Sequence, residues 1–112
     1  MFVEERTYTL QAGKTADYLA AYAKDGLEVQ RGHLGNLIGY FTTEIGPLNQ
    51  IVHMWGYDSL DDRQKRRRAL YADPRWQEYL PTVVPWLVHQ ESRILVPTSF
   101  SPVPGGTGPS SP

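Results

Sequence analysis

The chain contains no cysteine, so disulfide bridges and thiolate metal sites are excluded. It also lacks an excess of charge, because eleven basic side chains balance twelve acidic ones, for a formal net charge of -1. This balance argues against a general role at nucleic acids or membrane surfaces. No apolar run approaches the roughly 20 residues of a membrane span, and the start MFVEERTYTL lacks the pattern of a signal peptide. We therefore expect a cytoplasmic location, without nucleic acid or membrane as a partner.

The sequence after Val96 differs in composition from the rest. PTSFSPVPGGTGPSSP is almost all Pro, Gly, Ser and Thr, and such a segment buries too little apolar surface to offset its ordering entropy. We predict one domain over residues 1–96 and a tail over residues 97–112 that is flexible or partly docked through Phe100. A domain this small buries only about 60% of the surface of its unfolded chain, which favours a partner subunit.

Strands and helices alternate along the predicted domain. Runs rich in β-branched and aromatic residues predict four strands, at residues 2–10, 37–43, 50–57 and 88–96. Alanines and leucines at helical spacing predict a helix over residues 14–25 that stops at Gly26. Residues 27–33 form either a further helical turn or a loop.

Two helix starts follow the third strand. Ser59 is a suitable N-cap, and Asp73 is a second one with Pro74 at the first helical position. The resulting order, β-α-β-β-α-β, predicts an α+β fold on the ferredoxin-like plan. Its four-stranded antiparallel sheet would carry both helices on one face.

The third strand has two faces that both need cover. Val52 and Met54 share one face, whereas His53, Trp55 and Tyr57 share the other. Since the helices can cover only one face, we expect a homodimer in which two sheets close face to face. In this arrangement Val52 and Met54 pack under the helices, and the three ring-bearing side chains look into the space between the sheets.

The predicted site lies on this ring-bearing face. His53 titrates near physiological pH and is the candidate acid or base; the alternative is a structural histidine in the dimer interface. Arg6 on the first strand could bind an anion or oxyanion, or could simply pair with Glu4. The candidate catalytic residues are thus His53 and Arg6, and the candidate ligand-binding residues are Glu4, Tyr8, Trp55 and Tyr57.

No metal site or cofactor is predicted. The histidines lie far apart in the sequence and show no His-x-x-x-His spacing, and no phosphate loop or dinucleotide glycine pattern is present. The basic run from Arg63 to Arg68 spreads around the helix cylinder. It therefore predicts a solvated helix face rather than a nucleic-acid contact.

Several segments together resemble the NIPSNAP family. They are RTYTL at residues 6–10, HLGNLIGYF at 33–41, GPLNQ at 46–50, VHMWGYDSL at 52–60, DPRW at 73–76 and ILVP at 94–97. The resemblance implies a dimeric α+β barrel, in agreement with the argument from the sheet. It implies little chemistry, because the wider barrel superfamily includes monooxygenases, cyclases, isomerases and haem-degrading enzymes, and fold does not fix function.

Two hypotheses follow for the function. The first is a homodimer that binds a small apolar or aromatic molecule in the barrel cavity, with cofactor-independent oxygenation, proton transfer or rearrangement as candidate reactions. The alternative is a non-enzymatic interaction or ligand-sensing module with a filled dimer core. A solvent-accessible His53 would favour the first hypothesis, and an interior packed solid by Tyr8, Trp55 and Tyr57 would favour the second.

Overall fold

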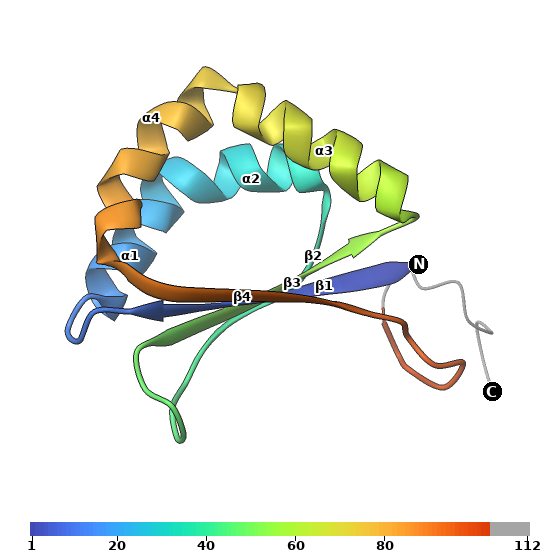
Figure 1. The fold of residues 1–112 in the computed structure, drawn as a ribbon, viewed down its shortest axis with the longest axis horizontal. Helices are drawn as coiled ribbons and strands as arrows, with labels where there is room; N and C mark the ends of the chain where they lie inside the picture. Colours follow the sequence, from blue (N-terminus) through green and yellow to red (C-terminus); the bar gives the residue numbers. More distant parts are fainter. Residues whose placement is uncertain (104–112) are drawn as a thin grey trace.

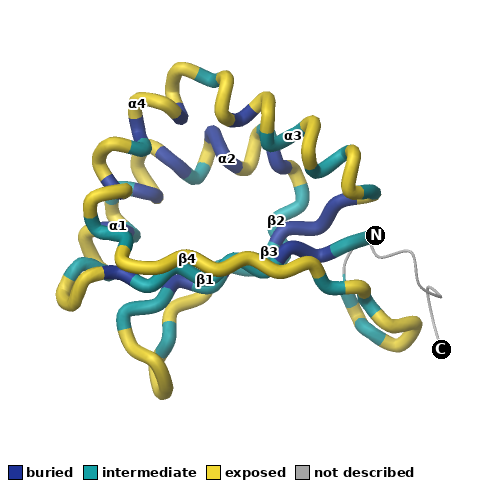
Figure 2. The backbone as a smooth tube through the Cα atoms, viewed as in Figure 1, coloured by how far each residue is buried: buried dark blue, intermediate teal, exposed yellow. Residues whose placement is uncertain are grey.

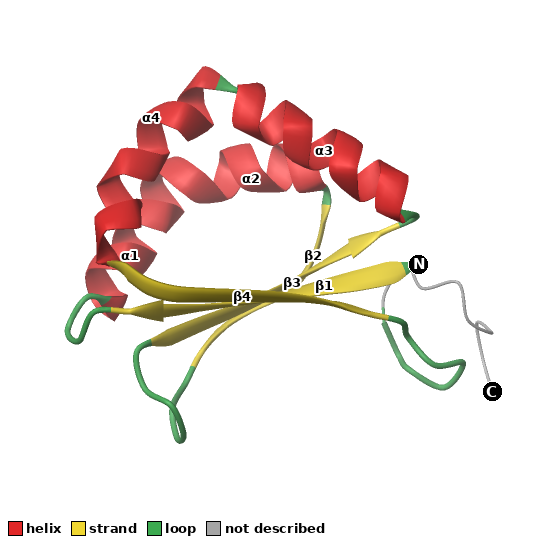
Figure 3. Cartoon of the chain, viewed as in Figure 1, coloured by secondary structure: helices red, strands yellow, loops and turns green. Residues whose placement is uncertain are grey.

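The computed structural model describes residues 1–103, so the predictions for residues 104–112 lie outside the described part. Four strands form one antiparallel sheet in the order β2-β3-β1-β4, and the helices lie over one of its faces (Figures 1 and 3). The strands are β1 (Phe2–Leu10), β2 (Asn36–Thr42), β3 (Gln50–Tyr57) and β4 (Leu87–Leu95). The α+β ferredoxin-like prediction is confirmed.

The first helical segment is longer than predicted. Helix α1 (Thr15–Ala21) continues through a π-helical turn, η1 (Tyr22–Gly26), into α2 (Leu27–Leu34), so the predicted stop at Gly26 is wrong. A Cβ on Gly26 would lie 2.7 Å from the Tyr22 ring and 2.8 Å from the Tyr79 ring. This glycine therefore serves close aromatic packing. The helix ends instead at Gly35, whose φ of 87° allows its N–H to bond to the Arg31 carbonyl.

Both predicted N-caps are confirmed. The Ser59 hydroxyl accepts the Asp62 N–H at 3.0 Å and begins α3 (Leu60–Ala72). The Asp73 carboxylate accepts the Arg75 N–H at 2.8 Å and begins α4 (Pro74–Val83). A short 3-10 turn, η2 (Val84–Trp86), then leads into β4. None of the helices in residues 1–103 is long and apolar enough to cross a membrane.

The prediction of which sheet face lies under the helices is wrong. Trp55 and Tyr57 belong to the core with the helical residues, at 0% and 3% exposure, and His53 on the same face is 1% exposed. Val52 and Met54 lie on the opposite, open face and are half-buried. The core between sheet and helices is built largely from ring-bearing side chains, and those of β3 pack among them.

The segment after β4 turns back below the open face (Figure 1). It forms a groove of about 340 Å³ with Val3 and Met54, lined on its own side by Ser101 and Val103 among others. Val3 is 5% exposed although it faces away from the helices. Phe100, through which the tail was predicted to dock if it docks at all, is 82% exposed.

Strand β4 at the sheet edge is almost entirely exposed, in contrast to β1 and β3 (Figure 2). Its pairing with β1 directs Gln90 and Ser92 to the helix-facing side. Both residues are nevertheless exposed. The helix layer therefore leaves this edge of the sheet open to solvent.

Candidate functional site

Glu4 is the centre of a buried polar network between β1, α3 and β4. Its side chain is 0% exposed. Arg63 from α3 donates from Nε to Oε1 at 2.9 Å and from an Nη to Oε2 at 2.8 Å. Arg6 donates to Oε2 at 3.0 Å, and the Ser92 hydroxyl donates to the same oxygen at 2.5 Å. The carboxylate is thus held from three elements.

This network keeps Glu4 ionised. Burial alone would raise its pKa, but the hydrogen bonds from Arg63 and Ser92 and the charge of Arg6 outweigh burial and lower the pKa to about 2. Burial alone would lower the pKa of Arg6, but its interactions with Tyr8 and Glu4 outweigh burial and raise this pKa above its ordinary value. Arg6 also donates to the Tyr8 hydroxyl at 2.9 Å. Of the two interpretations of Arg6, the structure therefore contains the ion pair with Glu4.

His53 lies beside this network, enclosed by rings. The Tyr40 ring stacks on the imidazole at 4.8 Å between centroids, and the Tyr8 ring meets it edge-on at 4.8 Å. The Trp55 indole nitrogen lies 2.7 Å from Nδ1 of His53. Because an indole N–H can only donate, Nδ1 must accept, and the imidazole hydrogen is then on Nε2.

The neutral state of His53 has a clear physical cause. Burial, followed by the positive charge of Arg6, lowers the pKa of His53 to about 3. The ring is therefore neutral at physiological pH, and Trp55 occupies its basic nitrogen. Its Nε2 is buried without a hydrogen-bond partner among the described residues. This arrangement suits a hydrogen-bond donor better than the predicted acid or base.

Further polar groups in the interior lack protein partners. Within residues 1–103 they are the hydroxyl of Tyr57 and the indole nitrogen of Trp76. The hydroxyls of Tyr40 and Tyr79 form no hydrogen bond of good geometry, but both act as donors toward the Tyr18 hydroxyl. Burial raises the pKa of Tyr57 to about 12 and those of Tyr40 and Tyr79 further, so all three hydroxyls stay protonated. Most buried polar groups in native proteins are paired. The Nε2–H of His53 and the O–H of Tyr57 are therefore donors that an additional acceptor could pair.

The structure brings every predicted site residue to this helix-facing side of the sheet: Glu4, Arg6, Tyr8, His53, Trp55 and Tyr57. Two partners of Glu4, Arg63 and Ser92, were not predicted, because they are 59 and 88 positions away and carry no local signal. Tyr40, which lies opposite His53 in the β2–β3 register, was not predicted either. Residues 37–43 and 50–57 were both predicted as strands of one antiparallel sheet, so the register between them was the available signal.

The other two histidines lie outside the site. His33 at the end of α2 contacts the Asp73 carboxylate at 2.8 Å, which ties α2 to the start of α4. His89 lies exposed on β4, 3.4 Å from Glu91. No three His, Asp or Glu side chains of residues 1–103 converge as a metal site would require.

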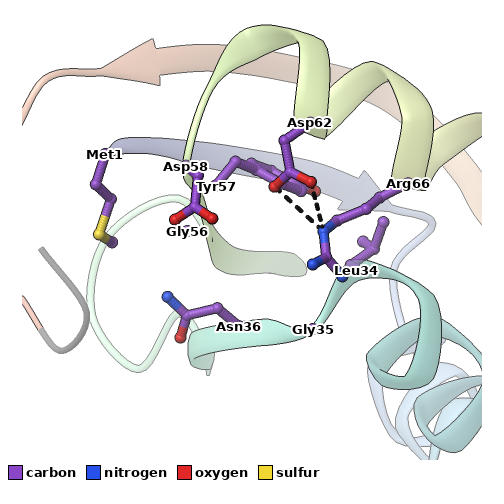
Figure 4. Close-up of a pocket in the computed structure, with 9 residues that line it drawn as sticks. All are labelled: Met1, Leu34, Gly35, Asn36, Gly56, Tyr57, Asp58, Asp62 and Arg66. Atoms are coloured by element: carbon purple, nitrogen blue, oxygen red, sulfur yellow. Dashed lines mark hydrogen bonds and ion pairs between the residues drawn. The ribbon is translucent and has the colours of Figure 1, made fainter.

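A separate cavity of about 390 Å³ opens at the end of the sheet (Figure 4). Arg66 lies at its α3 side, where it donates to the Asp62 carboxylate at 3.0 and 3.2 Å and to the His33 carbonyl at 3.1 Å. Asn36 at the start of β2 lines the opposite side. Tyr57 lines the cavity too. Burial and the negative charge of Glu4 both raise the pKa of its hydroxyl, so this residue borders both the cavity and the buried network.

Comparisons with known proteins place the chain. The NIPSNAP family model matches residues 3–102. The chain belongs to the NIPSNAP family. It is similar to the NipSnap protein of Drosophila melanogaster, at 33% identity over 99 residues, or 88% of this chain and 36% of that protein. It is also similar to a NipSnap protein of Caenorhabditis elegans, at 34% identity over 86% of this chain and 18% of that protein. The chain thus spans only 18% and 36% of the lengths of these two relatives.

Solved structures agree with this family membership. A NIPSNAP family protein of unknown function from Agrobacterium tumefaciens is 48% identical, with a TM-score of 0.91 over 92% of this chain and 93% of that chain. A NIPSNAP-like domain protein from Burkholderia xenovorans is 48% identical, with a TM-score of 0.89 over 92% and 90%. An antibiotic biosynthesis monooxygenase, 9% identical with a TM-score of 0.62 over 88% and 99%, shares the fold alone.

Proposed function

We propose that this NIPSNAP protein binds a small aromatic molecule with a hydrogen-bond acceptor, such as a carbonyl oxygen, between its sheet and its helices. The observation that carries the proposal is the Nε2–H of His53, a buried donor without a protein partner and flanked by two tyrosine rings. Rings supply stacking surface for a flat ligand, and a few placed donors fix its orientation.

The same geometry restricts the chemistry that the site could perform. A neutral imidazole that donates from Nε2 can polarise a carbonyl and stabilise negative charge developing on its oxygen. Glu4 is a weak base, because its low pKa and its hydrogen bonds both favour the bound carboxylate. Of the reactions considered, a rearrangement or proton transfer assisted by carbonyl polarisation fits the residues best.

We also propose that the protein is a homodimer whose open sheet faces pack together. Val52 and Met54 lie there half-buried, and Phe41 on β2 is 52% exposed. Light scattering at micromolar concentration should give twice the chain mass, and Val52→Asp should shift the mass toward the monomer. A monomer mass for the unmodified protein would refute the dimer.

Native mass spectrometry of freshly purified protein tests the ligand. We expect a bound small molecule whose occupancy falls in His53→Phe, which keeps a ring but removes the donor. His89→Phe, at an exposed position on β4, is the matched control and should retain the molecule. Equal occupancy in both variants would exclude His53 as the binding donor.

The alternative function is a non-enzymatic interaction module with a filled core. One observation favours it, because Trp55 and His53 are 0% and 1% exposed, so a ligand must displace packed side chains to reach them. A protein that purifies without a bound molecule, and whose His53 resonances stay unchanged when aromatic carbonyl compounds are added, would support this alternative.

A further inference from the structure

We propose that the ligand of this site is an aromatic anion, such as a carboxylate, and that Arg67 on α3 is the residue that binds its charge. This inference rests on the proposed function. It assigns a role to one member of the arginine run in α3, which the sequence alone suggests to be a solvated helix face.

The arginines of α3 fall into separate rows. Arg63 points to the sheet, where it binds Glu4 with two hydrogen bonds. Arg67 follows four residues later on the same side of the helix, and Leu70 in the next turn is 0% exposed. Arg67 is half-buried, whereas Arg68 is exposed. The sheet-facing row of α3 therefore contains Arg63 and Arg67.

The buried network has more positive than negative charge. Arg6 and Arg63 share the single carboxylate of Glu4. Arg67 has no carboxylate partner among the described residues. Its guanidinium donates at 3.3 Å to the hydroxyl of Tyr71, which is 46% exposed, and lies over the face of the same ring. Its charge nevertheless acts on both His53 and Tyr57. Two guanidinium groups thus share one carboxylate, and Arg67 adds a third positive charge one turn further along α3.

An anion would complete this arrangement. Arginine presents several donors in a planar fork that matches a carboxylate, and the nearby Nε2–H of His53 and O–H of Tyr57 are buried donors without protein partners. A cationic ligand would meet like charge, and a neutral one would leave the excess positive charge unbalanced. The interior therefore favours a negatively charged oxygen.

The open edge of the sheet provides a route to these groups. The side chain of Arg63 is 23% exposed, and Ser92, which binds the same carboxylate, is exposed on β4. Figure 2 shows β4 exposed along its length while the strands behind it are more buried. A charged ligand can therefore approach the buried carboxylate network along β4.

A matched pair of probes tests the charge preference. Benzoate and benzamide have the same ring and carbonyl but differ in charge. Binding of each probe can be followed by titration through the indole N–H resonance of Trp55, which is hydrogen-bonded to His53. At low salt the dissociation constant should be about tenfold lower for benzoate than for benzamide, because a charge-assisted hydrogen bond replaces a neutral one. The preference should shrink as salt is added.

Variants of neighbouring arginines locate the effect. Arg67→Gln should remove the preference for benzoate and leave benzamide binding unchanged, and Arg67→Lys should retain part of it. Arg68→Gln removes the same charge from an exposed position and should change neither affinity. Equal binding of both probes to the unmodified protein, or an equal loss in Arg67→Gln and Arg68→Gln, would overturn the inference and leave the proposed site intact. If neither probe moves the Trp55 resonance, the proposed function and the inference both fail.

Discussion

Replacing Glu4 by glutamine measures what the buried carboxylate contributes to stability. Glutamine keeps the size of the side chain but cannot ionise. The pKa of Glu4 is about 2 in the folded protein, against an ordinary value of 4.5. Because the folded pKa is the lower one, the stabilisation is fully present above pH 4.5 and is lost as the pH falls through about 2. The difference corresponds to about 3 kcal/mol at pH 7, of which about 2 kcal/mol is lost by pH 3.

Urea unfolding followed by tryptophan fluorescence at pH 7, 5, 4 and 3 provides the assay. Unmodified protein should exceed Glu4→Gln by about 3 kcal/mol at pH 7, and the gap should narrow to about 1 kcal/mol at pH 3. Glu91→Gln, whose side chain is 70% exposed, is the control and should leave the unfolding free energy unchanged. A gap that stays constant from pH 7 to pH 3 would refute the reasoning, because it would show that the charge of Glu4 is not the source of the stabilisation.

Three further predictions follow from individual residues. The pKa of His53 is about 3 in the folded protein, against an ordinary value of 6.5, so the free energy of unfolding should fall by about 2 kcal/mol between pH 8 and pH 5. Thermal unfolding of His53→Gln should show a weaker dependence on pH in this range. An unchanged pH dependence would contradict a neutral His53 in the folded protein. Gly26→Ala should cost about 1–3 kcal/mol in urea unfolding, because its Cβ would lie 2.8 Å from the Tyr79 ring. Gly32→Ala, with nothing within 4 Å, should instead add about 0.5–1 kcal/mol, and the same sign for both glycines would be inconsistent with the packing argument. Ser59→Ala should cost about 1 kcal/mol in thermal unfolding, through the lost N-cap, and an unchanged midpoint would show that the cap is replaceable.

Local patterns predicted most of the fold. Strands β1 and β3 have the predicted bounds, and the caps at Ser59 and Asp73 begin the helices expected of them. These features depend on neighbouring residues, so a short stretch of sequence contains the relevant information. Gly26 marks the limit of such patterns, because a glycine that permits close ring packing looks the same in sequence as one that ends a helix.

The candidate site was predicted as a set of residues but not as an arrangement. The alternation of side chains along the third strand correctly predicted that His53 and Trp55 share one face of the sheet. This alternation could not show which face the helices cover. That choice depends on the volume of side chains arriving from α1, α2 and α4. The partners Arg63 and Ser92 come from distant parts of the chain, so the ionised state of Glu4 could not be inferred before the fold was known.

The composition of the interior itself argues for a bound partner. Phenylalanine at position 57 would fill nearly the same volume as tyrosine without burying a hydroxyl, and an unpaired buried donor costs about 1–3 kcal/mol. Tyr57 and His53 nevertheless both present unpaired polar atoms within the described residues. The His53 nitrogen is fixed as a donor by Trp55, so its partner must be an acceptor. The proposed acceptor-bearing ligand would pair both groups, so their presence in the interior supports that proposal.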